Sequence, residues 1–362
     1  MEGAGDIAAL AIPFAAGAAA GFLAGEAAGS IAAWILPLGA LGAMTLFLLL
    51  CCRIRSGVSL YAALFFCLGA FSQFSQTLLP PASPFPAFAS DACEALKRLI
   101  ARIPYPHGRS APLVQALMTG DRSGLSPEVV AAFRRSGAAH ILALSGLHLG
   151  LIYLFIRRIL SLAGNAPAIR RVRCALTLGA TAFYTLMTGA GPSIVRAFLY
   201  ICIRELSALA QGRKRDPVRI LLAALTIQLA IQPRSIAQVG FQLSYLAMLG
   251  LTILLPRLQA WYPAPRTRLE RASPMRWIWN AAALSISCQV FTAPLAWIRF
   301  HTFPKYFLLT NLLSLPLTGA VMMVSVLTVI LSAAGLCPTV LIRLDDSLLG
   351  ALMFVLETIS AM

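Results

Sequence analysis

Long apolar segments alternate with short polar stretches along nearly the whole chain. A transmembrane α-helix needs about 20 consecutive, mostly apolar residues to cross the hydrocarbon core of a bilayer. The pattern therefore predicts an all-α polytopic membrane protein with roughly 10–11 transmembrane segments, some of them broken by Gly or Pro. The apolar segments are 7–25, 31–52, 58–79, 138–156, 174–190, 194–210, 218–232, 236–255, 277–298, 306–333 and 338–360.

Composition supports the membrane assignment. Hydrophobic residues make up 59% of the chain and charged residues only 12%, and the mean hydropathy is +0.80. A soluble globular domain carries about a quarter charged residues, so that class is excluded. We expect an N-terminal transmembrane hairpin region at 1–79, an extracytoplasmic linker with short amphipathic helices at 80–137, and a larger transmembrane domain at 138–362.

The positive charge is concentrated in alternate loops. The formal net charge is +16, and 26 of the 29 basic residues are Arg. Clusters of Arg follow the second, fourth, sixth and eighth apolar segments, and these four loops share one side if every segment crosses once. The positive-inside rule then places them, and the N-terminus, in the cytoplasm. An anionic cargo such as nucleic acid is the alternative source of this charge bias.

The stretch from Pro80 to Gly137 does not fit that rule, because it is basic and lies on the outer side. After a Pro-rich run, residues 88–103 predict one short amphipathic helix. A second helix is predicted after Ser126, with Ser126 as N-cap and Glu128 in the first turn. Its outer basic residues can contact anionic headgroups or attract a polyanion. The residues expected to form this outer basic surface are Arg122, Arg134 and Arg135.

The fourth apolar segment carries unusual polar residues. Ser145 and His148 share a helix face if the segment is helical, and Gly146 is a candidate helix break. The pair resembles a nucleophile and base, but no third group orients the His, and Ala143 replaces the first Gly of a GxSxG elbow. Lining of a polar cavity is the favoured interpretation, with a packed interhelical hydrogen bond as the alternative.

The segment from Gly189 to Ala197 places a charge inside the membrane. Gly191 and Pro192 predict a helix break, with Pro192 in the first turn of the next helix. Arg196 then lies one turn inside. A buried charge at that depth is costly, so Arg196 is either a functional residue or one that snorkels to the outer interface.

Two later regions complete the set of polar intramembrane residues. Gln242 and Ser244 lie near the start of the eighth segment, and Asn311 lies in the tenth. Pro294 and Pro316 each remove a backbone hydrogen bond and are expected to interrupt their helices, which points to a transport path.

Five motifs, taken together and in order, resemble those of the ComEC competence protein family. They are the stretch from Gly120 to Arg134, GAAHILALSGLHLG, GAGPSIVRA, GFQLSYLAMLGL and the pair TAPL and NLLSLPL. The resemblance implies a competence-type channel domain in the bacterial inner membrane, which takes up single-stranded DNA during natural transformation. The DNA path residues that it implies are Ser145, His148, Arg196, Gln242, Ser244 and Asn311.

The departures from that family limit the expected chemistry. Only the short stretch at 80–137 stands where many members carry an OB-like domain, and no His-x-His-x-Asp-His signature is present. We therefore expect a minimal, split or truncated member that is not an enzyme, with no catalytic residues, metal or cofactor. Expected partners are single-stranded DNA, the bilayer, and a separate DNA receptor, cytoplasmic ATPase and nuclease subunit. The alternative function is a secondary transporter or exporter of a small anionic solute.

Overall fold

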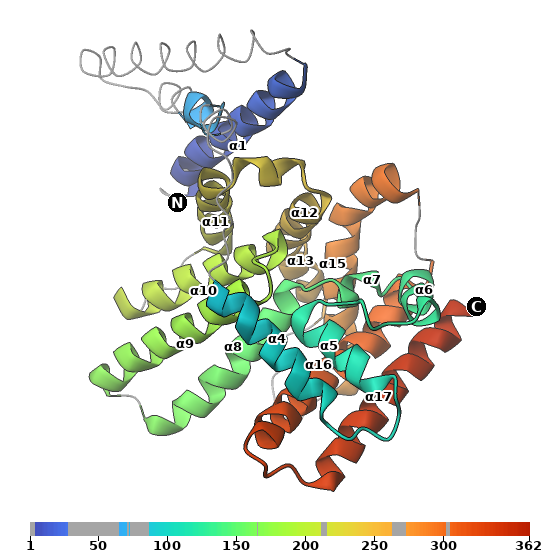
Figure 1. The fold of residues 1–362 in the computed structure, drawn as a ribbon. Coiled ribbons are helices and arrows are strands. Elements are labelled where there is room, and N and C mark those ends of the chain that lie inside the picture. Colours follow the sequence, from blue (N-terminus) through green and yellow to red (C-terminus); the bar gives the residue numbers. More distant parts are fainter. Residues whose placement is uncertain are drawn as a thin grey trace, which may run out of the picture. The chain divides into compact units, whose positions relative to one another are not determined.

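The computed structural model describes residues 4–27, 65–70, 72, 87–164, 166–210, 216–262, 273–301 and 305–362. All regular elements within these ranges are helices, and their order is drawn in Figure 1. The chain forms two compact units. Unit 1 comprises residues 1–84 and 199–249, and unit 2 comprises 85–198 and 250–362. Neither unit is continuous in sequence, whereas the three expected regions were.

Unit 1 contains helices that approach one another closely at glycines. Helix α1 (Ala4–Ala27) packs against α11 (Pro217–Ile231) and η2 (Pro233–Ala237). A Cβ atom on Gly17 would lie 1.9 Å from the carbonyl oxygen of Phe66, so only glycine permits this approach. The small core consists of Phe14, Leu229 and Phe241. The expected segment at 31–52, and most of that at 58–79, lie outside the described residues.

Unit 2 begins with the short helices α4 (Ala87–Ala101), α5 (Ser110–Thr119) and α6 (Pro127–Arg135). Both predicted amphipathic helices are confirmed as α4 and α6. The Ser126 hydroxyl accepts a hydrogen bond from the Val129 N–H at 3.4 Å, as expected of an N-cap.

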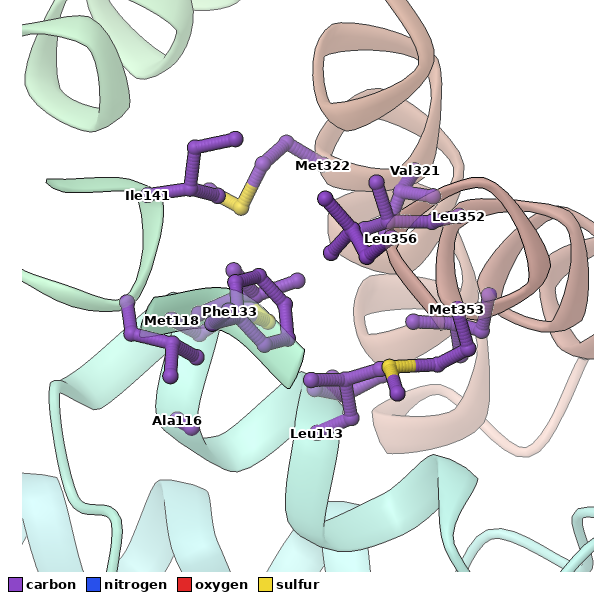
Figure 2. Close-up of a cluster of buried hydrophobic side chains, with 14 of the residues drawn as sticks. Leu113, Ala116, Met118, Phe133, Ile141, Val321, Met322, Leu352, Met353 and Leu356 are labelled. Carbon is purple, nitrogen blue, oxygen red and sulfur yellow. The ribbon is translucent and has the colours of Figure 1, made fainter. Parts of the chain in front are cut away.

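The apolar core of unit 2 is formed mainly by α4, α5, α6 and α7 (Ala139–Leu142) together with the C-terminal helices α16 (Phe307–Ala333) and α17 (Thr339–Ser360) (Figure 2). Phe133 of α6 is fully buried against side chains such as Leu113, Met322 and Leu352, which come from α5, α16 and α17. This shared core packs α4, α5 and α6 against the C-terminal helices α16 and α17. The other described helices are, in chain order, α8 (Gly146–Leu160), η1 (Ser161–Ala163), α9 (Pro167–Met187), α10 (Pro192–Ala210), α12 (Val239–Ile253), α13 (Leu255–Ala260) and α15 (Pro274–Phe300). The boundary between the two units falls within α10 and within α12.

Three described stretches are long and apolar enough to cross a membrane: Val239–Ala260, Pro274–Phe300 and Phe307–Ala333. The chain is an all-α membrane protein. The expectation that Pro294 and Pro316 interrupt their helices is wrong, because α15 and α16 continue through them. Both proline rings are exposed, and a proline removes only one backbone N–H, so the turns on either side keep the helix intact.

Candidate functional site

The junction between α7 and α8 positions the predicted Ser–His pair. The fourth apolar segment is not one helix: α7 ends at Leu142, and α8 begins at Gly146. Ser145 is the N-cap of α8, and its hydroxyl accepts the Leu147 N–H at 3.2 Å. The Ser145 N–H in turn donates to Nδ1 of His148 at 3.2 Å, which completes a capping box. Ser145 and His148 thus meet, but in a helix cap.

The second ring nitrogen of His148, Nε2, takes no part in the capping box. The side chain is fully buried, and its Nε2 atom has no hydrogen-bond partner among the described residues. Because Nδ1 accepts from a backbone N–H, the neutral ring carries its proton on Nε2. His148 therefore presents a buried, unpaired N–H donor.

Arg196 lies against the start of α8 within unit 2. A Cβ atom on Gly146 would lie 3.1 Å from Nη2 of Arg196 and 3.3 Å from Cβ of Ala197. Because Gly146 has no side chain, the guanidinium of Arg196 can occupy the space beside its Cα atom. Arg196 is 8% exposed.

The turn before α10 brings Arg196 to this place. Gly189 and Ala190 both have positive φ, at 84° and 43°, and the Ala190 N–H returns to the Thr185 carbonyl at 2.9 Å. Gly191 follows, and Pro192 is the first residue of α10. A proline is suited to that position because its fixed φ matches the helix and its missing N–H would have had no partner.

Gln242 and Ser244 lie in unit 1. The Gln242 amide donates to the carbonyl of Ile236 in η2 at 2.8 Å. The hydroxyl of Tyr245 donates to the buried Gln228 of α11 at 2.9 Å. Gln242 and Tyr245 therefore support the packing of α12 on η2 and α11, and Ser244 is half-buried in the same helix.

Asn311 lies on α16 among buried hydroxyl groups. Its Oδ1 atom is buried and has no partner among the described residues, and the same holds for the hydroxyls of Ser314 and Thr318. Sequence reasoning did not select Ser314 or Thr318. Their spacing from Asn311 could have indicated them, because residues three and four apart share a helix face. Positions 311, 314 and 318 therefore form a polar face on an otherwise apolar helix.

The outer basic residues belong to the surface of unit 2. Arg122, Arg134 and Arg135 are exposed, and Arg122 donates through Nε to the Leu142 carbonyl at 3.1 Å. Arg134 and Arg135 close the last turn of α6, where cations stabilise the helix dipole.

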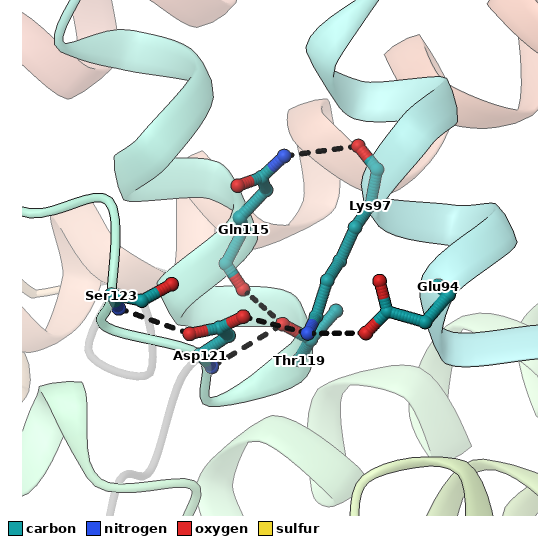
Figure 3. Close-up of polar contacts among 6 residues, drawn as sticks. All are labelled: Glu94, Lys97, Gln115, Thr119, Asp121 and Ser123. Atoms are coloured by element: carbon teal, nitrogen blue, oxygen red, sulfur yellow. Dashed lines mark hydrogen bonds and ion pairs between the residues drawn. The ribbon is translucent and has the colours of Figure 1, made fainter. Parts of the chain in front are cut away.

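A polar network holds α4 to the loop after α5 (Figure 3). Nζ of Lys97 lies 2.6 Å from the Asp121 carboxylate and 2.8 Å from that of Glu94. The hydrogen bond from Lys97, together with those from Ser123, holds the pKa of Asp121 well below its usual range. Hydrogen bonds to Asp121 and Glu94 raise the pKa of Lys97 above its usual value.

Sequence reasoning missed an acidic pair on α17. Asp345 is fully buried and accepts from Tyr105 at 2.6 Å and from Ser325 at 2.7 Å. Asp346 accepts from Ser110 at 2.6 Å, and its other oxygen lies 2.6 Å from Nδ1 of His107. The sequence did contain a signal for this pair. Two adjacent carboxylates lie inside a predicted transmembrane segment, where ionisable groups need partners.

The structure therefore unites some of the predicted residues and separates others. Ser145 and His148 share a cap, and Gly146 contacts Arg196. Gln242 and Ser244 belong to the other unit. No group of three or more metal-ligating side chains is present in the part of the chain that the structure describes.

Comparison with known proteins identifies the family. ComE operon protein 3 of Bacillus subtilis (strain 168) is 29% identical over 212 residues, which cover 57% of this chain and 24% of that protein. Uncharacterized protein YcaI of Escherichia coli (strain K12) is 25% identical over 224 residues, which cover 59% of this chain and 28% of that protein. The chain thus spans about a quarter of the length of these relatives. No solved structure matches it.

The match to a whole family is broader than these pairwise matches. Residues 117–362 match the competence protein family, and they include α6 to α17 with every polar residue described above on α8, α10, α12 and α16. Because that match takes in well over half of the chain, the protein belongs to the competence protein family.

Proposed function

We propose that this protein is a multi-pass channel of the bacterial cytoplasmic membrane that takes up single-stranded DNA during natural transformation. In this proposal the N-terminus is cytoplasmic, and the exposed Arg122, Arg134 and Arg135 meet DNA phosphates on the outer side. The proposal assigns no bond-breaking step to the chain. A DNA receptor, a cytoplasmic ATPase and a nuclease act as separate partners.

One observation carries the proposal. The family match extends over the same helices that bury polar groups inside apolar surroundings. Arg196 and His148 are 8% and 0% exposed within those helices. Ionisable groups at membrane depth are costly and mark substrate paths more often than inert anchors.

The proposal is tested in a naturally competent host that carries this gene. Deletion should abolish transformation and the uptake of labelled DNA, and the wild-type gene should restore both. Arg196→Ala and His148→Ala, at wild-type protein levels, should each lower the transformation frequency by about tenfold or more, equivalent to at least 1.4 kcal/mol in the limiting step. Unchanged transformation in the deletion strain would refute the proposal.

A pair of glycine variants separates a role of the Arg196 site from general damage to α8. Gly146→Ala pushes a methyl group against Arg196 and Ala197 and should reduce uptake. Gly150→Ala, one turn further along α8, meets nothing within 4 Å and should leave uptake unchanged. Equal uptake by the two variants would remove the Arg196 contact from the proposed path.

A further inference from the structure

Four buried polar atoms, one on α8 and three in the first half of α16, have no hydrogen-bond partner among the described residues. They are Nε2 of His148 on α8, and Oδ1 of Asn311, Oγ of Ser314 and Oγ1 of Thr318 on α16. His148, Ser314 and Thr318 are each 0% exposed. An orphaned polar atom inside a protein carries a desolvation cost, so a cluster of them calls for a polar occupant. The other such atoms among the described residues are Thr177 Oγ1, Arg219 Nε and Thr328 Oγ1.

Two contacts place α16 beside the stretch of chain that carries His148. The Thr310 hydroxyl, at the start of α16, donates to the Ser136 carbonyl at 2.6 Å. Further along, Leu151, Ile152 and Phe155 of α8 line a small apolar hollow together with Met322, Met323 and Val326 of α16. The stretch from Ser136 to Phe155 therefore runs beside α16 in the same direction.

In each of the two segments, the residues that carry the unpartnered atoms lie between these two contacts in the sequence. His148 lies between Ser136 and Leu151, and Asn311, Ser314 and Thr318 lie between Thr310 and Met322. His148 is also three and four residues before Leu151 and Ile152, so it shares the face of α8 that lies toward α16. Thr318 precedes Met322 by four residues and shares its face in the same way.

Two polar residues of α16 that flank this stretch have protein partners, whereas the Thr328 hydroxyl, further along the helix, has none among the described residues. Thr310 bonds to Ser136, and Ser325 donates to Asp345 at 2.7 Å. Within the part of the chain that the structure describes, the stretch beside His148 alone combines a donor, an acceptor and two hydroxyls that no described group engages. This mixture suits a solute with both donors and acceptors. It is poorly suited to a metal ion, because Nε2 of His148 carries a proton in the neutral ring and the three oxygen atoms are uncharged.

We propose that His148, Asn311, Ser314 and Thr318 form a hydrated polar track between α8 and α16, in which a single strand replaces water along its hydrogen-bonding edges. This inference rests on the proposed function and narrows it: the path runs along α16. Ser145 and Gln242 do not line the track, because their polar groups are engaged in local packing.

Water accessibility tests the track directly. Ser314→Cys and Thr318→Cys are made in the full chain, which is reconstituted in phosphatidylcholine–phosphatidylglycerol vesicles and treated with a small, charged methanethiosulfonate reagent. Mass spectrometry of the labelled peptide reads each site separately from the native cysteines. Both sites should react about tenfold or more faster than Val321→Cys, because a thiol needs water to form the reactive thiolate. Val321 is on the same helix, is also 0% exposed and has an apolar side chain.

A second control and a ligand arm complete the test. Leu313→Cys, which is 45% exposed on the same helix, should stay unreactive in vesicles because its surroundings are lipid. A single-stranded oligothymidylate should slow labelling at 314 and 318. Labelling of 314 and 318 as slow as at 321 would overturn the track, and so would labelling that the oligonucleotide does not slow. Either result leaves the transformation assay of the deletion strain, which judges the proposed function, unaffected.

Discussion

At the residue scale, most buried or half-buried charges in unit 2 have specific partners. Lys97 bonds to two carboxylates, and the Gln115 side chain donates to the Lys97 carbonyl at 2.9 Å. Asp345 and Asp346 likewise each have two partners. His148 stands apart because one of its two ring nitrogens is engaged and the other is not. In the proposed polar track, water or the bound strand would engage this second nitrogen.

The Lys97–Asp121 pair gives a pH-dependent prediction. The pKa of Asp121 is lowered by its hydrogen bonds from Lys97 and Ser123. The stability that it contributes is therefore fully present above the pKa of the unfolded chain, about 3.9, and is lost as the pH falls through the lower folded value. Asp121→Asn should cost about 0.5–1 kcal/mol at neutral pH, since the pair is partly exposed.

Thermal unfolding in detergent at pH 7, 4 and 3 measures this cost. The difference between wild type and Asp121→Asn should shrink below about pH 4, because Asp121 takes up a proton in the unfolded chain there while the folded carboxylate stays ionised. Asp91→Asn, at an exposed position of α4, serves as the control and should have little effect at any pH. A difference that is constant with pH would contradict the assigned role of the carboxylate.

At the element scale, glycines set how closely the helices pack. Gly250 on α12 faces α15, where a Cβ atom would lie 2.1 Å from the Ser287 carbonyl oxygen. The contact is to backbone, so a rotation of a side chain cannot relieve it. Close backbone approach at small residues is the usual way in which helices associate inside a membrane.

Gly250→Ala should therefore destabilise the protein by about 1–3 kcal/mol, as overpacking does. Gly240→Ala on the same helix meets nothing within 4 Å, and should be neutral or stabilising by up to about 1 kcal/mol. Unfolding midpoints of the two purified variants, compared with wild type, provide the measurement. Equal midpoints for the two would show that α12 and α15 are not in this contact.

At the scale of the whole molecule, α15 relates the fold to the bilayer. Trp277 and Trp297 are 51% and 56% exposed near its two ends. Trp297 follows Trp277 by 20 positions, a rise of about 30 Å along the helix, which equals the thickness of a hydrocarbon core. At the Trp277 end, Trp261 stacks on Trp279, and Arg276 lies 4.8 Å from the centre of the Tyr262 ring. Such aromatic and basic groups are typical of the membrane–water interface.

We expect Trp277 and Trp297 to lie at opposite interfaces. Two variants each keep a single tryptophan of the whole chain, either Trp277 or Trp297. The fluorescence of both should be quenched more strongly by lipids brominated near the headgroup than by lipids brominated near the chain end. Leu284→Trp in a background without other tryptophans, at an exposed position between them, should show the reverse order. Stronger quenching of Trp277 or Trp297 by the lipids brominated near the chain end would contradict the proposed depth of α15.

Local sequence patterns were sufficient for much of the helical structure. The amphipathic helices α4 and α6, the Ser126 cap and the membrane assignment all depend on spacing and composition within a few turns, so they could be predicted from the chain. The prolines were misjudged for the same local reason. Pro316 removes one hydrogen bond wherever it lies, but the rest of α16 decides whether the helix survives.

The site could be predicted only in part. The sequence by itself determined that Ser145, His148, Arg196 and Asn311 are polar groups inside apolar segments, because that follows from composition along the chain. Tertiary structure decided which of them are already engaged: Ser145 caps α8, whereas His148 and Asn311 each keep an atom that no other described residue contacts through a hydrogen bond. It also paired Tyr105 with Asp345, which is 240 residues away in the chain. Hydrogen bonding and burial depend on contacts between distant segments, and no local pattern encodes those contacts.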